Sequence, residues 1–136
     1  MKATPWLTVA GTLGALGVAI GAFGAHVLPA VLASRGLTQD EIASRLEMFH
    51  TGVRYHMYHA IALLVIAVLA RDGQNRRLNA SAILFLVGIG LFSGLLYAYA
   101  ITGVSALGRI VPIGGIAFVA GWSVLACAGT RKRRNY

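Results

Sequence analysis

"NASAILFLVGIGLFSGLLYAYAITG", residues 79 to 103, carries no charged side chain and is long enough to cross a membrane as a helix. About 20 apolar residues span the roughly 30 Å of hydrocarbon in a bilayer. Three further apolar stretches approach or exceed that length on either side of it, at residues 5–27, 53–70 and 110–128. The sequence therefore predicts an all-α membrane protein, a bundle of four transmembrane helices in which residues 1–136 form one integral membrane domain.

The overall composition agrees with a membrane protein. Hydrophobic residues make up 57% of the chain and charged residues only 12%, whereas a soluble domain carries about 25% charged residues. The first apolar stretch is longer than the roughly 7 to 15 residues of a signal-peptide core, so we expect it to be a retained helix. The single cysteine, Cys127, excludes an intrachain disulfide.

The charge distribution predicts the orientation in the membrane. With four spans, one side holds both termini and the middle loop, and this side has eight basic residues: Lys2, Arg71, Arg76, Arg77, Arg131, Lys132, Arg133 and Arg134. The other side has four: Arg35, Arg45, Arg54 and Arg109. The positive-inside rule then places both termini in the cytoplasm of a bacterium, with the protein in the inner membrane and Trp6 and Trp122 near the cytoplasmic interface. The net charge of +8 is assigned to this rule and to attraction of membrane lipids rather than to nucleic acid.

The polar connection between the first two spans predicts a short surface helix. Thr38 followed by Glu41 has the spacing of a capping box, and apolar residues then recur at helical intervals. We expect an amphipathic helix to begin near Gln39, to lie on the outer membrane surface, and to turn into the second span at Thr51 and Gly52.

Glycines at small-xxx-small spacing predict the faces on which the helices pack. Without a side chain, two helix backbones approach closely, and such residues are enriched at helix interfaces in membranes. The candidate packing positions are Gly14, Gly17, Gly21, Gly24, Gly90, Gly94, Gly114 and Gly121.

Chemistry-bearing side chains are concentrated in "FHTGVRYHMYHA", residues 49 to 60. Counting depth at 1.5 Å per residue, we expect the polar residues of all spans to meet at one mouth on the outer side. Ionisable groups at that depth are costly unless partnered, so such a cluster is a site hypothesis. The candidate ligand-binding residues are His26, Arg54, Tyr55, Tyr58, His59, Tyr97 and Arg109.

Three uses of this pocket stay open. The side chains could clamp the helices together without binding anything. They could donate hydrogen bonds to a quinone headgroup or a lipid phosphate. Alternatively, His26, His56 and His59 could hold a metal, or His26 and His59 a haem.

Several functional classes are disfavoured by what the spans lack. No predicted span contains Asp or Glu, which argues against an ion-coupled transporter. The sequence has no His-Glu-x-x-His zinc motif and no Gly-x-Ser-x-Gly elbow. We therefore expect a non-catalytic accessory or structural subunit without a cofactor, in contact with other membrane subunits or with further copies of itself. The competing hypothesis is a ligand-binding or redox protein that uses His26 and His59.

Four motifs in this chain resemble a known family. "GAFGAH" (21–26), "FHTGVRYHMYHA" (49–60), "LFSGLLY" (91–97) and "PIGGIAFVAGW" (112–122) resemble, in that order, the signature of the family called domain of unknown function 423, to which transmembrane protein 256 of animals looks related. The resemblance implies four spans in a bacterial inner membrane and no established activity. The chain departs from the family pattern at His50 and His56, where relatives resemble Glu and Gln. The matching motif positions are His26, Thr51, Gly52, Arg54, Tyr55, Tyr58, His59, Ser93, Gly94, Tyr97, Pro112, Gly114 and Gly115.

Overall fold

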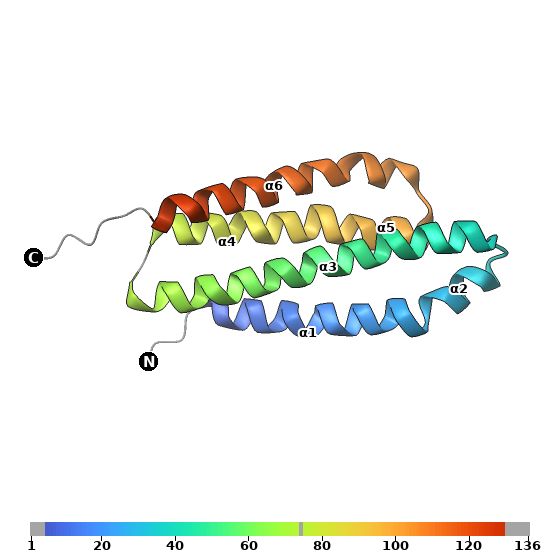
Figure 1. Ribbon diagram of the computed structural model, residues 1–136, viewed down its shortest axis with the longest axis horizontal. Coiled ribbons are helices and arrows are strands. Elements are labelled where there is room, and N and C mark those ends of the chain that lie inside the picture. The colour runs from blue at the N-terminus through green and yellow to red at the C-terminus, as the bar shows by residue number, and fades with distance from the viewer. Residues whose placement is uncertain (1–4, 74, 130–136) are drawn as a thin grey trace, which may run out of the picture.

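The computed structural model describes residues 5–73 and 75–129, and these residues are almost entirely helical (Figure 1). No strand occurs in the described ranges. In chain order the elements are α1 (Pro5–His26), α2 (Leu28–Ser34), α3 (Gln39–Leu69), the 3-10 turn η1 (Ala70–Asp72), α4 (Arg76–Gly88), the π-helical segment η2 (Ile89–Gly94), α5 (Leu95–Thr102) and α6 (Ser105–Gly129).

Four helical runs are long and apolar enough to cross a membrane, and they confirm the predicted all-α fold. They are Pro5–His26, Gln39–Leu69, Arg76–Thr102 and Ser105–Ala128. The third run joins α4, η2 and α5 into one span. The last span begins earlier than expected, so Pro112 lies inside α6 rather than in its first turn.

The spans alternate in direction, which brings the first and last helices to a common end (Figure 1). The start of α1, the turn η1 and the end of α6 lie together, and we call this the terminal end of the molecule. Helix α2 and the connection from α5 to α6 lie at the opposite end, which we call the loop end.

Helix α3 differs from the expected arrangement of a surface helix followed by a span. The capping box at its start is present, since Thr38 Oγ1 accepts from the Glu41 backbone N–H and Glu41 Oε2 accepts from the Thr38 backbone N–H at 2.9 Å. The helix then continues without a break through Thr51 and Gly52. Its 31 residues extend about 46 Å, so its first turns project beyond the hydrocarbon. The short helix that does separate the first two spans is α2 (Leu28–Ser34), with Pro29 in its first turn.

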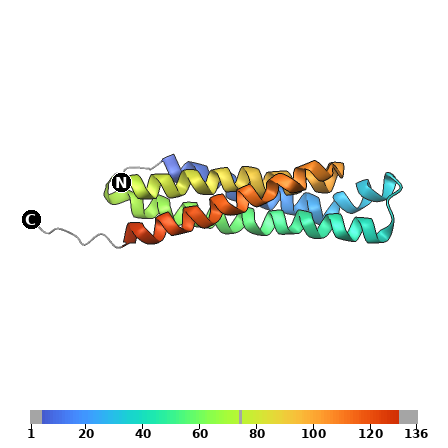
Figure 2. The same ribbon diagram turned by 90° about the horizontal axis from the view of Figure 1, so that it is seen from above.

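The helices form an open array rather than a closed ring. Helix α1 packs mainly on α3, α3 packs on η2 and α5, and the third span packs on α6. The two views together show α1 and α6 on opposite sides of this array (Figures 1 and 2). Helix α6 therefore has neighbours only along the third span among the closely packed pairs.

Glycines set the closest approaches between the spans. On α1, side chains of α3 occupy the space where Gly17, Gly21 and Gly24 would carry a Cβ. On α6, Gly114 lies against the backbone of η2, and Gly121 lies against Phe85. Three other glycines that were expected at packing faces do not contact another span in the structure. Gly14 and Gly90 face open space, and a Cβ at Gly94 would meet only a carbonyl of its own span.

Two apolar clusters fill the interior at different levels. One, toward the terminal end, is built around Leu63, Ile66 and Phe85. The other, toward the loop end, is built around Leu32 and Phe49. The stretch of α3 between these clusters contains the buried residues His56 and His59, so the polar interior lies between two apolar layers.

Candidate functional site

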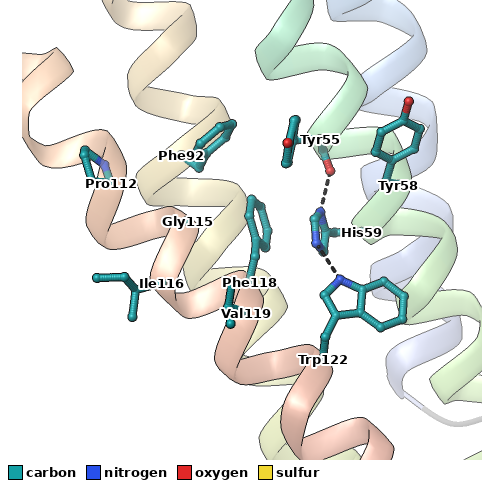
Figure 3. A pocket seen from close by; sticks show the side chains of 10 residues that line it. All are labelled: Tyr55, Tyr58, His59, Phe92, Pro112, Gly115, Ile116, Phe118, Val119 and Trp122. Carbon is teal, nitrogen blue, oxygen red and sulfur yellow. Dashed lines mark hydrogen bonds between the residues drawn. The ribbon is translucent and has the colours of Figure 1, made fainter.

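A groove of about 750 Å³ lies between α3 and α6, over η2 (Figure 3). This volume is typical of a small-molecule site. Aromatic and aliphatic side chains make up most of its wall, and Tyr58, Ile116 and Val119 are exposed within it. The lining residues are Tyr55, Tyr58, His59, Phe92, Pro112, Gly115, Ile116, Phe118, Val119 and Trp122.

His59 forms the polar centre of this groove, and its ring nitrogens are both bonded within the protein. The side chain is 3% exposed. Trp122 Nε1 lies 3.1 Å from His59 Nε2, and His59 Nδ1 lies 2.7 Å from the Tyr55 carbonyl oxygen (Figure 3). Because an indole N–H only donates, Nε2 must accept, and Nδ1 must carry the proton that is donated to the carbonyl. His59 is therefore a neutral imidazole that links α3 to α6.

Aromatic rings hold the His59 imidazole in this orientation. Phe118 stacks on it with ring centroids 3.5 Å apart and planes 8° apart. The Phe85 ring lies at 5.1 Å and the Trp122 ring at 6.1 Å. These contacts fix the ring plane, so the hydrogen bond to Trp122 and the stacking on Phe118 reinforce one another.

His56 makes a second polar link, between α3 and two other spans. Its Nε2 lies 3.0 Å from the Leu13 carbonyl oxygen of α1, and its Nδ1 lies 3.2 Å from the Tyr97 hydroxyl of α5. A carbonyl only accepts, so Nε2 carries the proton, and in the neutral ring the Tyr97 hydroxyl donates to Nδ1. The carbonyl of Leu13 is reachable because Gly17, one turn further along α1, has no side chain and lies against His56 and Met57.

The structure brings some of the predicted site residues together and separates others. Tyr55, Tyr58 and His59 line the groove. Tyr97 is instead bonded to His56. The remaining candidates, Arg54, Arg109 and His26, are exposed and do not line the groove.

His26 in particular lies far from His59. Gly24 of α1 is level with Phe49 of α3, and His26 follows Gly24 toward the loop end. His59 lies about ten residues from Phe49 toward the terminal end, a separation of about 15 Å along the helix. The two imidazoles therefore cannot share one iron, and no cluster of three His, Cys, Asp or Glu side chains that could hold a metal occurs in residues 5–73 and 75–129.

Both buried histidines lie deeper than the expected outer mouth. His59 stacks on Phe118, near the middle of α6 (Ser105–Gly129), and His56 contacts Leu13, near the middle of α1 (Pro5–His26). The physical reason is the unbroken α3, because a depth counted from Val53 begins too far along the helix.

Trp122 is the groove residue that sequence reasoning did not include among the site residues. A tryptophan near a span end is typical of the interfacial belt, and Trp6 does lie in the first turns of α1, donating to Asn79 Oδ1 at 2.9 Å. Trp122 instead uses its indole N–H to bond His59 of another span. The signal for this was its spacing from Phe118, which puts both rings on the same face of α6.

The fold and the site define a small, multi-pass helical membrane protein whose buried polar side chains connect its spans. The chain belongs to the family described as "Protein of unknown function (DUF423)", which matches residues 20–115. This confirms the resemblance seen in the four motifs. The relation to the animal protein stays a prediction.

Several bacterial proteins are similar to this chain over most of its length. The "UPF0382 membrane protein YwdK" of Bacillus subtilis is 42% identical over 118 residues, covering 85% of this chain and 88% of the relative. A "UPF0382 membrane protein" of Haemophilus influenzae is 40% identical, covering 89% and 90%. The "UPF0382 inner membrane protein YgdD" of Escherichia coli K12 is 32% identical, covering 95% and 92%. No solved structure matches this chain.

Proposed function

We propose that this protein is a non-catalytic structural or accessory subunit of a bacterial cytoplasmic membrane, whose buried histidines join its helices rather than carry chemistry. The observation that carries the proposal is the hydrogen bonding of His56 and His59. All four ring nitrogens are within hydrogen-bond distance of a protein donor or acceptor, on Leu13, Tyr97, Tyr55 and Trp122.

These bonds compete directly with the alternative role of a metal or haem ligand. A metal binds the lone pair of a neutral imidazole nitrogen. On His59 that lone pair accepts from Trp122, and on His56 it accepts from Tyr97. Binding a metal would break an interhelix bond inside the membrane, where an unsatisfied indole or hydroxyl is costly.

The open helix array supports an accessory role. In a ring of helices every span has two neighbours, whereas α1 here packs mainly on α3 alone. A Cβ added at Gly11 or Gly14 would meet nothing within 4 Å. Such small-residue faces suit close packing with another membrane helix, from a partner subunit or a second copy.

The proposed orientation places the terminal end in the cytoplasm. Arg71, Arg76 and Arg77 are the basic residues that the structure describes near that end, and the sequence adds Lys2 and the tail "RKRR" at 131–134, which lie outside the described residues. The loop end has fewer basic residues, which supports this orientation by the positive-inside rule.

The test is spectroscopic and metal analysis of the full-length protein purified in mild detergent. We expect no haem absorption and less than about 0.1 equivalent of any transition metal per chain. His59→Ala should change neither the absorption spectrum nor the metal content. A Soret band, or a stoichiometric metal that His59→Ala removes, would contradict the structural role. Ser123→Ala, on the exposed side of α6, is the matched control.

A further inference from the structure

We propose that the groove between α3 and α6 binds one anionic phospholipid from the leaflet at the loop end. Its phosphate would lie between Arg54 and Arg109, and one acyl chain would follow the groove toward Trp122. This inference depends on the geometry of the groove and not on the proposed structural role.

The length and lining of the groove fit one acyl chain. The lining residues of α6 run from Pro112 to Trp122, about 15 Å along the helix. This is half of the roughly 30 Å hydrocarbon thickness, the depth of a single leaflet. The wall is largely apolar, and its deep end at His59 has no free imidazole nitrogen to attract a headgroup.

Two arginines provide the charge complementarity at the loop end of the groove. Helices α3 and α6 both run from the loop end toward the terminal end. Arg54 precedes Tyr58 by about one turn of α3, and Arg109 precedes Pro112 by about one turn of α6. Both side chains are exposed, and neither has a carboxylate partner among the described residues. Arg54 Nη2 donates to Thr51 Oγ1 at 2.8 Å, which leaves its other guanidinium donors available. Arginines in this position match the geometry of a phosphate, to which guanidinium groups bind with paired hydrogen bonds.

Tyr58 adds a hydrogen-bond donor between the charged end and the apolar part. Its side chain is 57% exposed, and its hydroxyl points away from His59 and Trp122 (Figure 3). This hydroxyl has no hydrogen-bond partner among residues 5–73 and 75–129. The ester oxygens of a phospholipid lie between its phosphate and its chains, and this hydroxyl is a donor available to them.

A second copy of the chain fits this groove less well than a lipid. An inserted helix would bring its own spans against Arg54 and Arg109. The chain has only four acidic residues, and they are Asp40, Glu41, Glu47 and Asp72, none of them in the apolar part of a span. A second copy would have to bring Asp40, Glu41 or Glu47, in the first turns of its own α3, into register with both arginines, whereas one lipid phosphate at the membrane surface can neutralise both.

The fluorescence of Trp122, which lines the groove, gives a direct test. Trp6→Phe leaves Trp122 as the single tryptophan. This protein is reconstituted into phosphatidylcholine vesicles that contain a small fraction of either phosphatidylglycerol or phosphatidylcholine with brominated acyl chains, and quenching is measured. We expect brominated phosphatidylglycerol to bind more tightly, by about fivefold for each arginine.

Paired variants separate the headgroup site from the acyl groove. Arg54→Gln with Arg109→Gln should bring the preference for phosphatidylglycerol close to one, whereas Arg76→Gln, near the terminal end, should retain it. Gly115→Leu should fill the groove and lower quenching by both lipids. Its control is Gly108→Leu, at a glycine of the same helix that faces open space.

Three results would overturn the proposal. The first is equal quenching of the Trp6→Phe protein by the two brominated lipids, or a preference that survives loss of both arginines. The second is quenching that falls as protein density in the vesicle rises, which would assign the groove to a second copy. The third is a stoichiometric quinone that copurifies with the protein and is lost in Gly115→Leu.

Discussion

At the scale of single residues, the surroundings rather than the residue type decide what the histidines do. His56 donates through Nε2 to a carbonyl, whereas His59 accepts at Nε2 from an indole. The sequence places both on the buried side of one helix, because they are three residues apart. The sequence alone does not show the partners of three of the four ring nitrogens, since Leu13, Tyr97 and Trp122 come from three other helices. The fourth partner, the Tyr55 carbonyl, lies on α3 itself.

Removal of the indole N–H tests the link between α3 and α6. Trp122→Phe keeps an aromatic ring but leaves His59 Nε2 without a donor, so we expect a loss of about 1 kcal/mol in unfolding free energy, as for other hydrogen bonds between membrane helices. Unfolding in detergent with increasing denaturing surfactant is the measurement. Ser123→Ala removes a hydroxyl that bonds only within α6, and it should leave stability nearly unchanged.

A double-mutant cycle then assigns that loss to the pair. In the His59→Phe background, Trp122→Phe should cost clearly less than it does alone, because the acceptor it would leave unpaired is already absent. Strictly additive losses would show that Trp122 stabilises the protein through its ring and not through His59.

At the scale of elements, the sequence predicts existence and type better than boundaries. Long apolar stretches specify the four spans, and Thr38 with Glu41 specifies the start of α3. The unbroken course of α3 was not predicted, because the change from polar to apolar composition at Thr51 resembles a turn. In the structure Gly52 stays helical and lets α3 pack closely against Tyr97. The groove between α3 and α6 was also missed, since it depends on how the spans are ordered.

The glycines of α6 differ in the space around them, and this gives a prediction about one helix. A Cβ at Gly114 would collide with backbone atoms of Leu91 and Phe92, whereas one at Gly108 would meet nothing within 4 Å. Backbone cannot rotate away, so Gly114→Ala should push α6 off η2 and cost about 1 to 3 kcal/mol. Gly108→Ala should be neutral or slightly stabilising, since Ala favours a helix by about 1 kcal/mol over Gly. Equal unfolding curves for the two variants would contradict this close approach.

At the scale of the whole molecule, an even number of spans couples the positions of both termini. The start of α1 and the end of α6 lie at one end (Figure 1), so a single topological measurement determines both. The packing of the helices does not by itself determine which end of the molecule faces the cytoplasm. Orientation must come from the charge difference between its ends, which the sequence supplies and the helix packing does not.

Labelling of single cysteines measures that orientation. In a Cys127→Ala background, Ser34→Cys puts a thiol on the exposed end of α2 at the loop end, and Tyr136→Cys puts one after the basic tail. We expect a membrane-impermeant maleimide to label the first variant in intact cells, and the second only after the membrane is opened. The physical reason is that translocating the basic residues of the terminal end is disfavoured relative to the fewer basic residues of the loop end. The reverse labelling pattern would place the termini outside and would also move the lipid groove to the cytoplasmic leaflet, where anionic headgroups attract arginines in the same way.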